Sequence, residues 1–171
     1  TIKRLIDIDG DGRMDEAQMF ANNLPPCYGM VAARGGLIVA CSPHIMFLAD
    51  RDNDGKAEVR EVLFTGFPEG VLERRLNAPQ WGLDGWIYFG TGHGGTEITG
   101  PNLKDAVTLP RTDLRIRPDG SAIEPVSGTT WGMGFAFTET DERFVSSIGW
   151  PATSIVPLPW RYLARNPFLP S

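Results

Sequence analysis

Carboxylates recur at a spacing that can hold a calcium ion in one segment of this 171-residue chain. Residues 50–61 read DRDNDGKAEVRE, with Gly55 at the sixth position, where a calcium loop turns sharply. Lys56, at the seventh position, would contribute its backbone carbonyl oxygen. The acidic side chains stand at the first, third, fifth, ninth and twelfth positions: Asp50, Asp52, Asp54, Glu58 and Glu61. Because these ligands are hard oxygens and the segment holds no His or Cys, the pattern favours Ca²⁺ over zinc.

A second segment repeats most of this pattern near the start of the chain. Residues 7–15 read DIDGDGRMD, again with glycine at the sixth position and with Arg13 at the carbonyl position. Its carboxylates belong to Asp7, Asp9, Asp11 and Asp15. The twelfth residue is Gln18 rather than an acid, so we expect weaker calcium binding here than in the loop at 50–61.

Both segments could also be solvated acidic turns without an ion. Carboxylates this close repel one another unless a cation neutralises them, which makes calcium our expectation for both. The flanking residues 45–48 and 59–64 have the composition of β-strands rather than the period of amphipathic helices. We therefore expect structural hairpin loops and not the helix-flanked switch of an EF-hand.

The elements that would position these loops are predicted to be strands throughout. The 20 Gly and 14 Pro punctuate short apolar runs, and no long stretch has helical periodicity. Acidic or glycine-rich turns recur in order, with about four strands to each pair of turns, as a propeller blade requires. Strands are expected at residues 37–41, 45–48, 59–64, 86–89, 114–117, 134–137 and 144–147.

We predict an all-β fold, a β-propeller of four-stranded antiparallel blades, with a β-sandwich as the competing architecture. Residues 1–149 would form about three to four blades, and a closed ring needs roughly four to eight. Closure would then require the remainder of a larger propeller or another subunit. Repeated prolines predict that residues 150–171 form an extended tail or linker.

Two cysteines lie at the ends of a predicted hairpin. The turn at residues 34–36 would bring Cys27 and Cys41 near one another. A disulfide and a pair of buried thiols both fit this arrangement.

Composition disfavours several classes of partner. A net charge of -5 would repel nucleic acid. No apolar run approaches the roughly 20 residues that a membrane-spanning helix needs. The chain starts at Thr1, with neither Met nor an apolar leader, as a processed or trimmed product would.

The chain resembles the "membrane-bound dehydrogenase" propeller domains of planctomycete-type bacteria, which are related to soluble quinoprotein glucose and sorbosone dehydrogenases. The resemblance covers nearly the whole chain and is carried by DIDGDGRMDE at 7–16, DNDGKAE at 52–58, WGLDGWIY at 81–88 and RPDG at 117–120. It implies a six-bladed propeller in an extracytoplasmic, periplasmic or secreted location. In enzymatic members it implies calcium and pyrroloquinoline quinone (PQQ), with a sugar or alcohol as substrate. There a His accepts the hydroxyl proton as hydride leaves for the quinone.

The expected catalytic base is missing from the place where the resemblance puts it. Residues 73–77 read ERRLN, and arginine cannot accept a proton. His93, in the glycine-rich run 90–95, is the substitute candidate for the catalytic role. By analogy, the substrate- or cofactor-binding candidates at the propeller mouth are Arg74, Arg75, Asn77, Glu97 and Trp131.

Each of these side chains also fits an ordinary loop position. Two functions therefore stay open. One is a quinoprotein-like sugar or alcohol dehydrogenase, and the other is a non-catalytic calcium-binding propeller module that binds carbohydrate or a partner protein.

Overall fold

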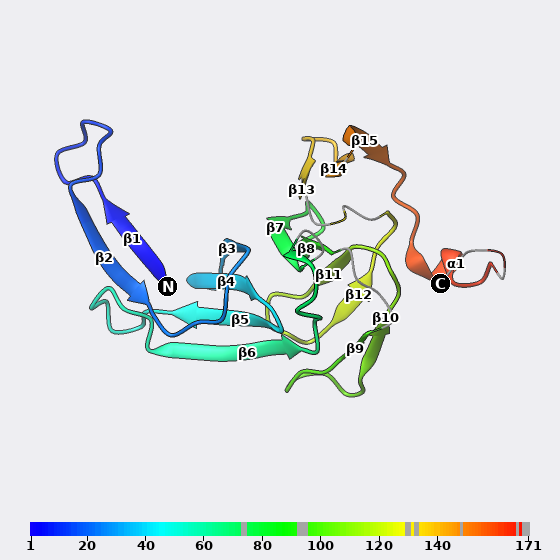
Figure 1. The fold of residues 1–171 in the computed structure, drawn as a ribbon, viewed down its shortest axis with the longest axis horizontal. Helices are drawn as coiled ribbons and strands as arrows, with labels where there is room; N and C mark the ends of the chain where they lie inside the picture. Colours follow the sequence, from blue (N-terminus) through cyan, green and yellow to red (C-terminus); the bar gives the residue numbers. More distant parts are fainter. Residues whose placement is uncertain are drawn as a thin grey trace.

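The computed structural model describes residues 1–72, 75–91, 96–128, 131, 134–147, 149–166 and 168. In these residues the chain is all-β apart from one short helix, α1 (Trp160–Leu163), which confirms the predicted class. Its strands form small antiparallel sheets that follow one another along the chain (Figure 1). Among the described residues these sheets do not close into a ring.

A four-stranded meander contributes many of the buried apolar side chains. Its strands lie in chain order and are β3 (Gly29–Ala33), β4 (Gly36–Cys41), β5 (His44–Ala49) and β6 (Val59–Thr65). The turn between β3 and β4 consists of Arg34 and Gly35, with φ of 54° and 69°. Two consecutive positive φ values make the type I′ turn, whose twist matches that of the paired strands. The hairpin predicted around residues 34–36 is confirmed.

A disulfide joins Cys27, just before β3, to Cys41 at the end of β4. The pairing continues beyond β3, because the Tyr28 amide donates to the Ala40 carbonyl at 2.8 Å. Of the two arrangements that the sequence left open for these cysteines, the structure has the disulfide.

A second four-stranded sheet has the order β12-β11-β8-β7. Its strands are β7 (Asn77–Trp81), β8 (Ile87–Gly90), β11 (Leu114–Ile116) and β12 (Ile123–Pro125). The small hairpin of β9 (Thr96–Ile98) and β10 (Val107–Leu109) is inserted between β8 and β11. Without that insertion this sheet would be a four-stranded meander like the first.

Two further sheets lie nearer the ends of the chain. The N-terminal hairpin consists of β1 (Ile2–Ile6) and β2 (Glu16–Ala21). A three-stranded sheet follows the second meander and contains β13 (Gly134–Phe137), β14 (Arg143–Ser147) and β15 (Trp150–Ile155). Residues 150–155 were expected to be tail, but they pair with β14, so in the described part of the C-terminal segment the residues without strand pairing begin after Ile155.

Alternate side chains of the central meander enter two different cores. Ile38 and Phe47 pack with apolar residues of β8 and β11, whereas Val39 and Leu48 pack against the β1–β2 hairpin. None of these four side chains is more than 1% exposed. Complete burial of such a side chain stabilises the fold by about 1.5–3 kcal/mol. The meander is thus the layer that holds the N-terminal hairpin and the second sheet together.

Candidate metal centre

The hairpin β1–β2 and the hairpin β5–β6 are copies of one structural unit, 43 residues apart in the sequence. Ile2 pairs with Ala21 as Ile45 pairs with Phe64, and the remaining pairs correspond in the same way. Each hairpin also has a register shift directly after this first pair. Each acidic segment is therefore the loop between the two strands of such a unit.

The same hydrogen bonds shape the two loops. In the second loop the Asp50 carboxylate accepts from the Asn53 amide at 2.7 Å and from the Gly55 amide at 2.9 Å. In the first loop Asp7 accepts from the amides of Gly10 at 2.7 Å and Gly12 at 3.0 Å. The carboxylate at the first position thus folds the chain back on itself, and its negative charge strengthens both hydrogen bonds.

Each loop passes twice through the left-handed region of φ. The residues with positive φ are Gly10 and Gly12 in the first loop. In the second loop they are Asn53 and Gly55. Gly and Asn are the residues that adopt this conformation at least cost. The sequence pattern therefore encodes the backbone path as well as the charges.

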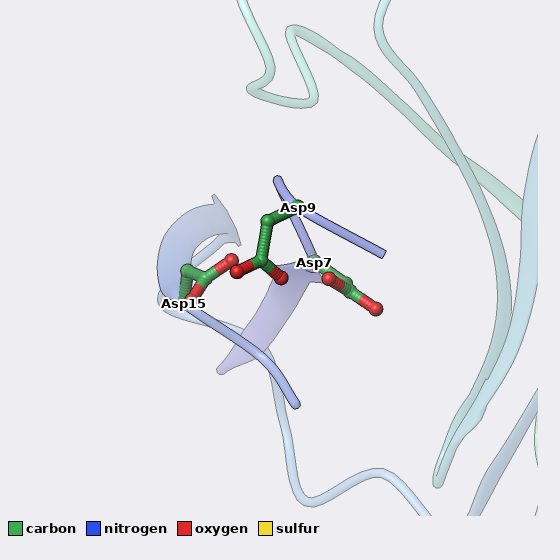
Figure 2. A group of neighbouring side chains, drawn as sticks. All are labelled: Asp7, Asp9 and Asp15. Atoms are coloured by element: carbon green, nitrogen blue, oxygen red, sulfur yellow. The ribbon is translucent and has the colours of Figure 1, made fainter. Parts of the chain in front are cut away.

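The fold gathers three carboxylates in each loop. In the second loop, oxygens of Asp50, Asp52 and Asp54 lie within 4.8 Å of one another. The group in the first loop has the same spread and consists of Asp7, Asp9 and Asp15, and Figure 2 shows the carboxylate of Asp9 between those of the other two. The first and third positions are common to both groups. The third member comes from the fifth position in one loop and from the ninth in the other.

Two predicted ligands outside these groups, Asp11 and Glu58, accept hydrogen bonds from backbone amides. The carboxylate of Glu58 accepts from the Arg51 amide at 2.7 Å, and that of Asp11 accepts from the Arg13 amide at 2.7 Å. Lys56 donates its amide to Asp54 at 2.8 Å, as Arg13 does to Asp11. Asp11 and Glu58 therefore help to shape the loops.

Glu61, the predicted twelfth ligand, lies in β6 and forms an ion pair with Arg34 at 3.6 Å. Its counterpart Gln18 lies in β2, and its amide donates to the carbonyl of Asp54 at 3.0 Å. A Cβ atom at Gly55 would overlap the Gln18 side chain. Gln18 therefore joins the two acidic loops, a role that sequence spacing did not indicate.

Two candidates at the predicted propeller mouth, Arg74 and His93, lie outside the described residues. Arg75 donates to the Tyr28 hydroxyl and to the carbonyl oxygens of residues 69 and 70. The Asn77 amide donates to the Arg75 carbonyl at 3.1 Å. The structure thus brings Arg75 and Asn77 together, with the guanidinium held by protein oxygens.

The other two candidates come from different parts of the fold. Glu97 lies in the inserted β9–β10 hairpin, and Trp131 is 42% exposed.

A separate cleft of about 420 Å³ lies between the second sheet and the three-stranded sheet. Arg115, in its wall, bridges the carboxylates of Asp84 and Glu124 at 2.7 and 2.8 Å. The hydroxyl of Tyr88 donates to Asp84 at 2.9 Å. Burial raises the pKa of Tyr88, against the hydrogen bond from Arg115, which lowers it.

A buried ion pair lies beside this cleft. Arg143 and Asp113 are 3.4 Å apart, with side chains 5% and 0% exposed. Burial lowers the pKa of Arg143, although the charge of Asp113 acts to raise it. The guanidinium also donates to the Ser127 carbonyl. The charges of this region are therefore largely paired within the protein.

Residues 1–171 match the family model described as "Domain of unknown function (DUF7133)". The chain belongs to this family. No curated protein and no solved structure matches it. Among the described residues, no helix is long and apolar enough to cross a membrane.

Proposed function

We propose that this chain is a calcium-binding part of a β-propeller-type domain, in which the two acidic hairpin loops hold structural calcium ions. The supporting observation is the equivalence of the loops, which share strand register, hydrogen bonds and a group of three gathered carboxylates. A divalent cation would remove the repulsion within each group, and oxygen ligands from Asp suit calcium.

The order of the strands supports successive blades. The first sheet, β3-β4-β5-β6, is a plain meander, and β7-β8-β11-β12 becomes one when the β9–β10 insertion is left aside. The hairpin β1–β2 repeats the second half of the first meander, and β13-β14-β15 is a three-stranded meander in chain order. Antiparallel meanders that follow one another in this way are the units of a propeller.

An extracytoplasmic location belongs to the same proposal. The Cys27–Cys41 disulfide is most easily kept oxidised outside the cytoplasm. Weak oxygen sites of the kind proposed here are filled at the calcium concentrations typical of extracellular modules.

Titration calorimetry with Ca²⁺, and with Mg²⁺ for comparison, tests the proposal. We expect calcium binding that raises the melting temperature, as any ligand of the folded state must. The diagnostic variant is Asp9→Asn with Asp52→Asn, because asparagine keeps the oxygen that accepts the backbone hydrogen bond in each loop. Its matched control is Asp105→Asn with Glu139→Gln, which removes two exposed charges elsewhere.

Calcium binding should be strongly weakened in the loop variant and unchanged in the control. A wild-type chain that shows no heat of calcium binding, and whose melting temperature is the same in calcium and in chelator, would overturn the proposal.

Sugar or alcohol oxidation with PQQ remains a prediction that rests on the sequence resemblance. Reconstitution with calcium and PQQ, followed by dye reduction with aldoses and alcohols, measures it directly. A chain that retains no quinone absorbance and reduces no dye would be a non-catalytic module.

A further inference from the structure

The second acidic loop is joined to the N-terminal hairpin along the segment that leads into β6. We call residues 54–60 the exit segment. The side-chain amide of Gln18, in β2, donates to the Asp54 carbonyl at 3.0 Å. The Ala57 amide donates to the carbonyl of Phe20, also in β2, at 2.7 Å. Figure 1 shows the loop between β5 and β6 next to the end of β2.

The exit segment is also part of the core between the hairpin and the central meander. Ala57 is 3% exposed and packs with apolar residues of both. Arg60 donates to the carbonyl of Asn22, directly after β2, at 2.8 Å and to its side-chain oxygen at 3.3 Å. A movement of the exit segment would therefore break hydrogen bonds to the hairpin and uncover apolar surface at the same time.

The first acidic loop makes no such contacts in the described part of the chain. The hydrogen bonds of residues 7–15 stay within the β1–β2 hairpin. None of these nine residues is buried. The two loops thus share a backbone path and differ in what a change of that path would disturb.

The charges of the second loop act on the path that the hairpin contacts. The Asp50 carboxylate accepts from the Gly55 amide at 2.9 Å, directly after the Asp54 carbonyl that binds Gln18. A Cβ atom at Gly55 would overlap the Gln18 side chain, so the loop and β2 fit closely here. Repulsion within the group of Asp50, Asp52 and Asp54 opposes this path, and a bound cation would remove the repulsion.

We propose that calcium in the second loop regulates the docking of the N-terminal hairpin on the central meander. This inference rests on the calcium site proposed for that loop. In the docked state the exit segment holds β2 through the contacts above. In the released state those contacts are lost, and the Cys27–Cys41 disulfide keeps the hairpin tethered to the meander. Because linkage is reciprocal, docking of the hairpin must strengthen calcium binding in the second loop by the same factor.

Hydrogen exchange of the full chain, in calcium and in chelator, measures docking. Amides of residues 17–24 and 54–60 report on the junction, and those of β8 in the second sheet serve as the internal reference. Removal of calcium should speed exchange at the junction about tenfold and leave β8 unchanged. The variant Asp52→Asn should exchange as fast in calcium as the wild type does in chelator. Its matched control Asp9→Asn should keep most of the protection, because it alters the loop that does not contact the meander.

Gln18→Ala tests the reverse direction of the coupling. In the background Asp9→Asn, calcium binding is measured at the second loop alone. There Gln18→Ala should weaken calcium binding about fivefold, although Gln18 is not a member of the gathered carboxylates. Gln18 is only partly buried, so its truncation should leave the fold intact. A side chain that merely packed on the loop surface would leave the calcium affinity unchanged.

The outcomes separate this inference from the calcium site on which it rests. No heat of calcium binding in the wild-type chain would overturn the proposed function and this inference with it. Calcium binding without any change of exchange at residues 17–24 and 54–60 would overturn this inference alone. So would equal losses of protection in Asp9→Asn and Asp52→Asn, or an unchanged calcium affinity in the Gln18→Ala variant.

Discussion

The substitution Asp52→Asn is expected to have opposite effects on stability with and without calcium. The carboxylate of Asp52 is held near those of Asp50 and Asp54, and its Oδ1 accepts a hydrogen bond from the Asp54 amide at 3.1 Å. Asparagine keeps that acceptor oxygen and removes the charge. The variant therefore tests the electrostatics of the loop while leaving its backbone hydrogen bonds in place.

The size of each effect follows from the geometry. Two unit charges 4.8 Å apart repel by about 0.9 kcal/mol in water. Physiological salt reduces this to about half, so removing Asp52 relieves about 1 kcal/mol from its two neighbours. In chelator the melting temperature should rise by about 3 °C.

In calcium the lost ligand should outweigh this relief. Substitution of a residue that hydrogen-bonds to a metal ligand typically weakens metal binding by about 10- to 100-fold. Loss of a charged ligand itself should weaken calcium binding by an amount at the upper end of that range. A hundredfold weaker site loses about 2.7 kcal/mol of stabilisation at saturating calcium. The net change is about 1.7 kcal/mol less stability, or roughly 5 °C in melting temperature.

Thermal unfolding of wild type, Asp52→Asn and the control Asp105→Asn, each in calcium and in chelator, measures both effects. Asp105 is exposed and lies outside the acidic loops, so its substitution should behave alike in the two conditions. A shift of the same sign in both conditions for Asp52→Asn would refute the reasoning. Repulsion without a cation and ligation with one cannot both hold in that case.

Three further predictions concern the rest of the fold. Replacing Cys27 and Cys41 by serine should lower the free energy of unfolding, measured in urea, by about 3 kcal/mol. Reduction of the disulfide in the wild-type chain should lower it by the same amount. Arg143→Met should lower the free energy of unfolding by about 3–5 kcal/mol, because it leaves the charge of Asp113 buried without its cation. Adding Asp113→Asn should restore much of this stability. If the double variant is no more stable, the buried charge is not the cause. Burial raises the pKa of Tyr88, so this hydroxyl loses its proton at lower pH in the unfolded chain than in the folded one. The free energy of unfolding should therefore fall as the pH rises above about 10. Tyr88→Phe should lessen this fall, and an unchanged pH profile would contradict the assignment.

The sequence predicted the strands that are apolar and bounded by clear turns. The runs at 37–41, 45–48 and 59–64 became β4, β5 and β6 with small changes at their ends. The N-terminal strand IKRLI was missed because two adjacent basic residues, both exposed, interrupt its pattern. Alignment of residues 2–21 with 45–64 would have revealed it.

Other strands gave no usable signal. The strands β9, β10 and β12 have three residues each, too few for a period of two to be recognised. The equally short β11 lies within the strand expected at 114–117. Pro151 argued against a strand after residue 149, but β15 is at the edge of its sheet, where a missing N–H is tolerated. Short length and edge position thus account for most of the differences.

The acidic loops show where sequence spacing succeeds and where it fails. The carboxylates at the first and third positions lie close together in both loops, as the spacing predicted. They do so because the hydrogen bonds of Asp50 and Asp7 determine the backbone path. Position twelve follows a rule for a loop that ends in a helix. Here residues 61 and 18 lie in β-strands, whose alternation sends Glu61 to Arg34 and Gln18 to the carbonyl of Asp54. The carboxylate of Glu61 is therefore paired with Arg34 and is not part of the group formed by Asp50, Asp52 and Asp54. The hydrogen bond from Gln18 to the Asp54 carbonyl connects the two loops, so a change of structure in one loop should alter the other.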